Sequence, residues 1–194
     1  MSSPRLALVL LALLAAAAPA GAAERRWVPV SGPSVVTFGA THPLGDFTGR
    51  SGAVAGEIRA DPEDLRRPVS GWVAVPVTSL TTGLEGRDRD LWSLLAAPGH
   101  PDIRFTVGRV EASFPTVADR ADVLLTIGGT LRVRGVERDV TLLGRVRQQD
   151  SRLWVRGEGE VRLTWFGITP PSRFFLAVGD LVRVAFDVLL APGD

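Results

Sequence analysis

Few side chains of this sequence could make or break a bond. The chain contains two histidines, His42 and His100, and no cysteine, so general bases are scarce and thiolate chemistry is excluded. No serine lies in a nucleophile elbow, and Gly83-Leu84-Glu85-Gly86 is no nucleotide-binding fingerprint because no helix-opening G-x-G-x-x-G follows a strand. The sequence therefore predicts a protein that is not an enzyme and needs neither a cofactor nor a metal ion.

Two polar groups could instead hold the head group of a ligand. His42 follows an apolar-alternating run and precedes Pro43, which places it at a sharp turn. It could hydrogen-bond a ligand there, although neighbouring backbone groups are its favoured partners. Arg87 and Asp88 could form an ion pair at the mouth of a site or bind a polar head, while an exposed pair at the start of a helix is the favoured interpretation.

Apolar side chains offer a larger candidate site. Phe38, Phe105 and Phe186 occupy the apolar faces of predicted strands, so they line either a packed core or a pocket. Gly157 shares the apolar face of its strand and leaves volume where a core would hold methyl groups. A ligand cavity and relief of crowding in a curved sheet explain this volume equally well. If a cavity is the reason, Gly157→Leu should block binding with little loss of stability.

Alternation of apolar and polar residues predicts the elements that position these side chains. One face of each strand is dry and one is wet in about eight segments, at residues 35–41, 47–58, 69–79, 103–107, 123–133, 140–146, 153–163 and 182–188. The phase changes within residues 47–58, which predicts a β-bulge near Gly49 and Gly52. One short helix is expected over residues 87–97.

Short connections between such strands are typical of an antiparallel sandwich or barrel. A closed barrel removes the exposed edges that so many strands would otherwise present. An eight-stranded barrel can either fill with side chains or hold one small ligand. The predicted fold is therefore all-β, an antiparallel eight-stranded barrel with one short helix.

The first 23 residues have the anatomy of a signal peptide. Arg5 supplies the positive charge, Leu6–Leu14 forms a short apolar run, and small residues follow up to Ala23. No cysteine follows the run, so a lipoprotein anchor has no acceptor. We expect residues 1–23 to be removed and residues 24–194 to form one domain that is exported to the periplasm or secreted.

The charge of the chain argues against nucleic acid as a partner. All 22 basic residues are arginine, and Arg5 is the one that the leader carries. The mature chain then has 21 basic and 21 acidic residues with scattered signs. Nucleic-acid binding usually needs a clustered basic face, which this sequence does not predict.

The order of several short motifs resembles the YceI-like family of bacterial secreted proteins. Residues 37–49 follow its opening pattern, T-F-x-A-x-H-x-x-G-x-F-x-G. Further motifs follow in the family's order: Asp61-Pro62, residues 73–83, Arg87-Asp88 with Leu91, residues 100–105, Gly129-Thr130-Leu131 with Gly135-Val136, Phe166-Gly167-Ile168 and Val178-Gly179-Asp180. Each motif is short, but their joint order covers nearly the whole chain after the leader.

The resemblance implies a lipocalin-like barrel that binds a long-chain lipid, such as a polyisoprenoid, a quinone or a fatty-acid derivative. The family often carries Arg and Asp where this chain has Leu163 and Trp165, so a more apolar ligand or a different head-group contact is expected here. The candidate lipid-binding residues are Phe38, His42, Phe47, Val75, Arg87, Leu91, Phe105, Leu125, Gly157, Phe166 and Phe186.

An alternative function remains open at this point. The chain could be a secreted stress or interaction protein with a filled barrel, no lipid cargo, and apolar loops that contact a partner. A homodimer and transient contact with a membrane are compatible with either function. The open or filled state of the barrel therefore distinguishes the two hypotheses.

Overall fold

The computed structural model describes residues 24–117, 121–173 and 176–193, so the predicted leader lies outside it. Within these residues the chain forms β1 (Arg25–Pro29), β2 (Val35–Ala40), β3 (Phe47–Ser51), β4 (Ala55–Ala60), β5 (Ser70–Pro76), the 3-10 helix η1 (Val77–Ser79), α1 (Glu85–Leu94), β6 (Asp102–Ala112), β7 (Val123–Val133), β8 (Val136–Gln149), β9 (Arg152–Arg162), the 3-10 helix η2 (Leu163–Phe166), β10 (Ser172–Arg173), β11 (Leu176–Ala177) and β12 (Leu181–Pro192).

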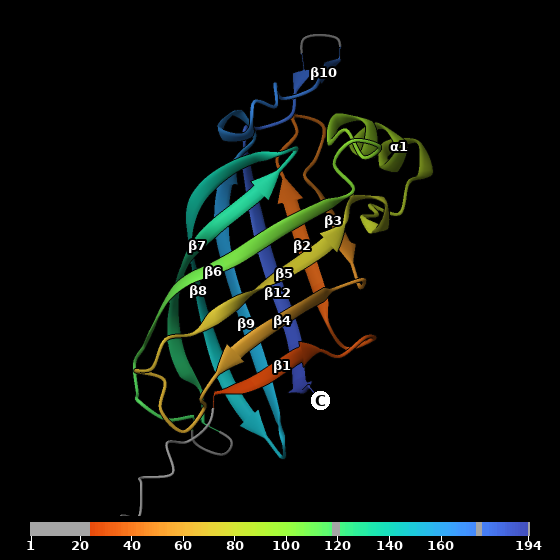
Figure 1. The fold of residues 1–194 in the computed structure, drawn as a ribbon. Helices are drawn as coiled ribbons and strands as arrows, with labels where there is room; N and C mark the ends of the chain where they lie inside the picture. The colour runs from red at the N-terminus through yellow and green to blue at the C-terminus, as the bar shows by residue number, and fades with distance from the viewer. Residues whose placement is uncertain (1–23, 118–120, 174–175, 194) are drawn as a thin grey trace, which may run out of the picture.

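Eight strands close into an antiparallel barrel (Figure 1). Their order around the barrel is β1-β4-β5-β6-β7-β8-β9-β12, and β12 pairs back onto β1, where Trp27 lies opposite Pro192. This confirms the predicted fold. Alternating side chains put the apolar face inside, and the β12–β1 pairing closes the ring of eight strands.

One prediction about the strands is wrong. Residues 47–58 form two strands, β3 and β4, instead of one bulged strand. β3 pairs with β2, whereas β4 pairs with β1 and β5. The phase changes because the chain leaves one part of the sheet at residues 52–54 and joins another. The hydroxyl of Ser51 fixes this corner, since it accepts a hydrogen bond from the Ala53 N–H at 3.0 Å.

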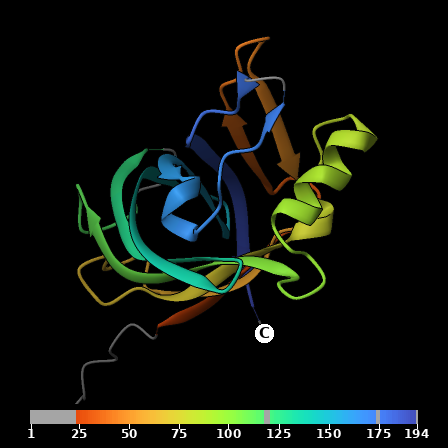
Figure 2. The same cartoon turned by 90° about the horizontal axis from the view of Figure 1, so that it is seen from above.

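The two ends of the barrel differ. We call the end that carries η1, α1 and η2 the helix end, and the opposite end the loop end (Figure 1). At the helix end β2 and β3 extend away from the barrel wall, and α1 lies beside them, outside the wall (Figure 2). Arg50 and Thr81 join β3 to the segment before α1 through two backbone hydrogen bonds of 2.8 and 2.9 Å.

The helix is confirmed, two residues earlier than expected. It starts at Glu85 and ends at Leu94, whereas the sequence predicted residues 87–97. The chain cannot continue the helix because Ala96 has a positive φ of 52° and Pro98 follows. The indole N–H of Trp92 donates to the Leu80 carbonyl oxygen at 2.9 Å and holds α1 against η1.

Two apolar clusters form the core of the protein. The loop-end cluster consists of Trp27, Val54, Ala60, Leu65, Val117, Val123, Leu125, Ile127, Val146, Leu153, Val188 and Leu190. The helix-end cluster consists of Ala40, Val75, Val77, Leu80, Leu95, Ala97, Val133, Val140, Val161, Phe166, Ile168 and Val182. Val36 and Phe105 pack against both clusters, so the interior is continuous.

The inward glycines lie under phenylalanine rings. Phe186 lies directly across from Gly157 in the β9–β12 pair, and Phe38 lies across from Gly49. A Cβ atom added at Gly157 would lie 2.5 Å from Cζ of Phe186 and 2.5 Å from the carbonyl oxygen of Leu143. The volume at Gly157 is therefore taken by an aromatic ring and backbone. The condition under which Gly157→Leu was expected to be tolerated, an open cavity at this glycine, is therefore not met.

We expect Gly157→Ala to lower the free energy of unfolding by about 1–3 kcal/mol, the usual range for overpacking. The backbone oxygen of Leu143 cannot move away without disturbing the β8–β9 pair. Gly86→Ala in α1 is the control, because a Cβ there meets no atom within 4 Å. Chemical denaturation should show Gly86→Ala unchanged or stabilised by up to about 1 kcal/mol. Equal stability of both variants would contradict the close contact at Gly157.

Candidate functional site

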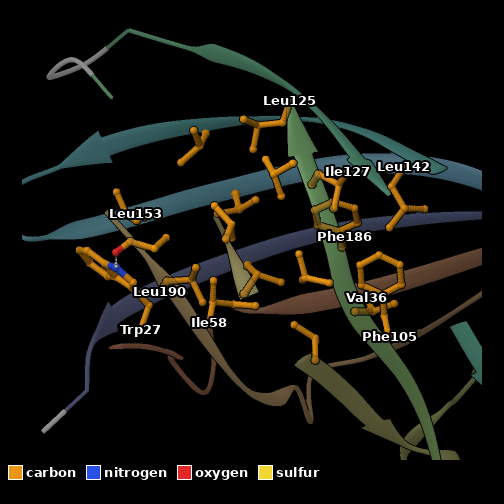
Figure 3. A pocket seen from close by; sticks show the side chains of 18 of the residues that line it. Trp27, Val36, Ile58, Phe105, Leu125, Ile127, Leu142, Leu153, Phe186 and Leu190 are labelled. Carbon is orange, nitrogen blue, oxygen red and sulfur yellow. Dashed lines mark hydrogen bonds between the residues drawn. The ribbon is translucent and has the colours of Figure 1, made fainter. Parts of the chain in front are cut away.

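A cavity of about 220 Å³ lies inside the barrel. Figure 3 shows Phe105 and Phe186 toward one end of the lining, with Trp27, Leu153 and Leu190 grouped toward the other. The side chains around it come from strands and from the loop end: Trp27, Val36, Ile58, Ala60, Pro62, Leu65, Val69, Val73, Val75, Ile103, Phe105, Val107, Val110, Val117, Leu125, Ile127, Leu131, Val140, Leu142, Val146, Leu153, Val155, Val161, Val184, Phe186, Val188 and Leu190.

Among the residues that the structure describes, the cavity lining is apolar. The one side-chain N–H among these lining residues belongs to Trp27, which is 3% exposed and donates to the Ala60 carbonyl oxygen at 3.3 Å (Figure 3). Because the Trp27 N–H already donates to a backbone oxygen, these side chains offer a ligand no hydrogen bond. They offer dispersion contacts and the release of water instead. Hydrocarbon is the chemistry that fits this surface.

Four of the predicted site residues line the cavity. Val75, Phe105, Leu125 and Phe186 come from β5, β6, β7 and β12, and their side chains face the barrel interior as the period-two pattern predicts. Because these strands lie on different sides of the barrel, the four residues surround the cavity.

The other apolar predictions lie at the helix end. Phe166 is 3% exposed in the helix-end cluster, and Phe38, Phe47 and Leu91 pack against that cluster. None of these four lines the cavity. Gly157 does not line it either, because the ring of Phe186 lies between. Phe38, Phe47, Leu91 and Phe166 therefore belong to the packed core at the helix end and not to the cavity lining.

The two polar candidates also lie away from the cavity lining. Nδ1 of His42 accepts a hydrogen bond from the Leu44 N–H at 3.1 Å, which confirms the interpretation of a turn histidine satisfied by backbone. The guanidinium of Arg87 lies over the ring of Phe47, 4.9 Å from its centroid. Neither side chain reaches the apolar lining.

The favoured interpretation of Asp88 as an exposed partner of Arg87 is wrong. Asp88 is 6% exposed, and its carboxylate accepts hydrogen bonds from both hydroxyls and one N–H of Thr81 and Thr82, at 2.6 to 2.7 Å. The Thr82 hydroxyl, then the Thr81 hydroxyl and the Thr82 N–H, hold the pKa of Asp88 below its ordinary value. Asp88 therefore fixes the chain at the start of α1.

A second carboxylate anchors η2. Asp180 accepts hydrogen bonds from the backbone N–H and the hydroxyl of Thr164, each at 2.9 Å. The Thr164 N–H is the largest cause of a pKa below the ordinary value for Asp180, and Arg162 adds to it. Asp88 and Asp180 together fasten the two segments that cover the helix end.

These two pKa shifts predict an acid-sensitive helix end. A carboxylate with a lowered pKa in the folded state stabilises that state above the ordinary value of 3.8, and this stabilisation is lost as pH falls through the folded pKa. Below pH 3.8 we therefore expect faster hydrogen exchange at the Thr82 and Thr164 amides, relative to strand amides, after correction for intrinsic rates. Uniform loss of protection across the barrel would contradict separate anchoring.

The loop end carries lining residues that the sequence did not single out. Two loops, residues 61–69 and 113–117, meet there, and we call this pair the loop clasp. The Leu65 N–H donates to the Pro115 carbonyl oxygen at 2.6 Å, and the Val117 N–H donates to the Pro62 carbonyl oxygen at 2.8 Å. Pro62, Leu65, Val69 and Val117 line the cavity. The apolar character of Leu65 and Val117 between turn residues was the available signal.

Neither a metal cluster nor a membrane helix is found in the part of the chain that the structure describes. Over residues 24–117, 121–173 and 176–193, no three histidine, aspartate or glutamate side chains group to hold an ion. Within the same ranges, no helix is both long and apolar enough to span a bilayer.

Comparisons with known proteins agree with this architecture. The chain is similar to Burkholderia cenocepacia BcnA, with a TM-score of 0.69, 16% identity, and coverage of 83% of this chain and 98% of that one. A polyisoprenoid binding domain from Saccharophagus degradans gives a TM-score of 0.68 and 14% identity, over 88% of this chain and 100% of the other. The YCEI protein of Campylobacter jejuni gives 0.61 and 20%, over 75% and 84%.

The sequence comparison identifies the family. None of the curated proteins matches the chain significantly. The YceI-like domain, however, matches residues 27–190, which include every strand of the barrel wall from Trp27 in β1 to Leu190 in β12. The chain therefore belongs to the YceI-like family.

Proposed function

We propose that the protein binds a long-chain apolar ligand, an isoprenoid, quinone or fatty-acid derivative, inside the barrel and carries or sequesters it. The observation that carries this proposal is the apolar cavity of about 220 Å³ at the centre of the molecule. A similar structure is described as a polyisoprenoid binding domain, which supports the same ligand class. The cavity also argues against the alternative of a filled barrel.

Burial of hydrocarbon is sufficient to drive such binding. Each methylene transferred from water to an apolar site contributes about 0.8 kcal/mol, so a segment of about ten carbons contributes about 8 kcal/mol before the costs of association. A free energy of this size does not require a polar contact within the cavity.

The size of the cavity limits what it holds as it stands. Its volume of 220 Å³ lies below the roughly 300–1,000 Å³ that is typical of ligand pockets. A single chain segment fits, whereas a long polyisoprenoid requires lining side chains or a loop to move. The proposal therefore includes some adjustment of the barrel on binding.

The proposed work involves no chemical step. His42 and His100, the two histidines of the chain, do not line the cavity. We also propose that the protein acts outside the cytoplasm, after removal of residues 1–23. Intact-mass measurement of exported protein should then show a new N-terminus between Ala20 and Arg25.

Mass spectrometry of organic extracts tests the ligand class. The protein is purified gently from its host, without detergent, and extracted with solvent alongside an unrelated exported protein from the same cells. We expect an isoprenoid, quinone or fatty-acid derivative in an amount that approaches that of the protein. Extracts with no lipid above the control, together with no uptake of an apolar fluorescent probe, would overturn the proposal.

A further inference from the structure

We propose that the ligand enters and leaves through the loop clasp, and that the helix end stays closed during exchange. This inference rests on the proposed function, because it concerns the route to the same cavity. It also orients an amphiphilic ligand: the hydrocarbon tail points toward the helix end, and the polar head lies at the loop clasp.

The residues around the cavity point to the loop end. Pro62, Leu65 and Val117 of the loop clasp line the cavity directly. At the helix end, Val75, Val140 and Val161 line the cavity, whereas Val77 and Ile168 of the same cluster, each 1% exposed, do not. The helix end therefore has further packed side chains beyond the lining. At the loop end, the exposed residues Glu63 and Thr116 directly adjoin the lining residues Pro62 and Val117.

The two loops of the clasp are also joined by fewer hydrogen bonds than hold the segments at the helix end. Two backbone hydrogen bonds, from Leu65 and from Val117, join the two loops of the clasp, and an exposed Arg25–Glu63 ion pair links one loop to β1. The bonds within the loop 61–69, such as that from the Asp64 N–H to the Asp61 carbonyl oxygen, need not break when the loops separate. The segments at the helix end are held by the paired bonds of Arg50 and Thr81, by three bonds to the buried Asp88, and by the bonds to Asp180. Separation of the two clasp loops therefore breaks fewer hydrogen bonds than release of the helix-end segments, and segments held by fewer bonds open at a lower free energy.

A buried carboxylate at the base of the clasp favours this opening. Asp61 is 3% exposed, and its Oδ1 accepts a hydrogen bond from the Glu63 N–H at 3.0 Å. Its Oδ2 is buried without a hydrogen bond, and Nε of Arg67 lies 3.7 Å from it. Movement of the loop would bring water to this oxygen, so the closed clasp carries a penalty that the open clasp relieves.

A polar head group is more stable beside the charged residues of the clasp than inside the apolar cavity. Arg25 pairs with Glu63 at 2.9 Å, and Arg66 pairs with Asp64 at 2.7 Å, all at the loop end. A head group that remains there keeps its contact with water and with groups of both signs. Placed in the cavity, it would lose its hydrogen bonds without replacement.

Two engineered disulfides test the route. The chain has no cysteine, so each pair of introduced cysteines can form one defined crosslink. Glu63→Cys with Thr116→Cys closes the clasp, because these exposed residues adjoin Pro62 and Val117, whose backbone atoms are 2.8 Å apart. Arg50→Cys with Thr81→Cys is the matched crosslink at the helix end, where the two residues form a hydrogen-bonded antiparallel pair.

The probe is N-phenyl-1-naphthylamine, an uncharged apolar fluorophore, mixed rapidly with oxidised and reduced forms of each protein. We expect oxidation of the clasp pair to slow uptake at least about tenfold, because binding then lacks the conformational change it needs. Reduction should restore the faster rate of the same variant before oxidation, and the helix-end pair should take up probe at the same rate in both states. When the protein is loaded with probe before the clasp is oxidised, oxidation should slow the release of probe by a similar factor.

Other outcomes separate the two proposals. No uptake by the wild-type protein would overturn the proposed function and the route with it. Normal uptake by wild type and by the oxidised clasp pair, or an equal or greater slowing by the helix-end pair, would overturn the route alone. If the two cysteines of the clasp pair do not oxidise, Asp64→Cys with Thr116→Cys places a crosslink one residue further along the same loop.

Discussion

Replacing Leu142 with tryptophan should weaken the binding of an apolar probe while the barrel stays folded. Leu142 points from β8 into the cavity, and a larger side chain there occupies the space that a ligand needs. We expect affinity to fall at least about tenfold, or about 1.4 kcal/mol. Because the neighbouring volume of 220 Å³ accepts part of the indole, the loss of stability should stay below the roughly 3 kcal/mol seen on overpacking a filled core.

Leu143→Trp is the matched control for this prediction. Leu143 follows Leu142 in β8 but points outward and is 62% exposed. The same substitution one residue away should therefore leave both uptake and unfolding almost unchanged. Titration with N-phenyl-1-naphthylamine and chemical denaturation of both variants measure the two effects. Equal uptake by the two variants would show that the probe binds outside the barrel.

Replacing Phe166 with alanine should cause one of the largest losses of stability in the chain. Phe166 is 3% exposed within the helix-end cluster, so its removal leaves a cavity that rigid strands cannot fill. Such substitutions cost about 3–5 kcal/mol of unfolding free energy. Because Phe166 does not line the ligand cavity, uptake of the probe should survive at temperatures where the variant stays folded.

Trp165→Ala provides the comparison for Phe166→Ala. Trp165 is the adjacent residue of η2 and is 41% exposed, so its truncation should change stability by no more than about 0.5 kcal/mol. Thermal melts of both variants, with and without probe, test the difference. A Phe166→Ala variant that is stable but no longer takes up probe would show that the helix end belongs to the binding site.

The strands of the barrel could be predicted from the sequence because the alternation of apolar and polar residues lies within each strand. The alternation in residues 123–133 matched β7 residue for residue, and β8 and β9 are separate strands as the segments 140–146 and 153–163 predicted. The break between β3 and β4 could not be predicted in this way. Whether a change of phase reflects a bulge or a change of partner depends on strands that are distant in the sequence.

The cavity could be predicted only in part. Phe105, Phe186, Val75 and Leu125 were found because an apolar strand face must point into a closed barrel. The role of Gly157 was misjudged because the sequence does not show that Phe186 lies opposite it. The loop clasp was missed because its residues lie between strands and have no periodicity, so only the fold brings Leu65 next to Pro115.

The position of β12 has a consequence for the order of folding. This last strand of the chain pairs with β9 along one side. Along the other side it pairs with β1 and β2, the first two strands. Until Leu181–Pro192 is available, β1 and β2 lack this partner and β9 has an open edge. Pairings between such distant segments form slowly, which leaves these edges exposed to aggregation before closure. A newly made chain therefore exposes these strand edges until β12 completes the ring.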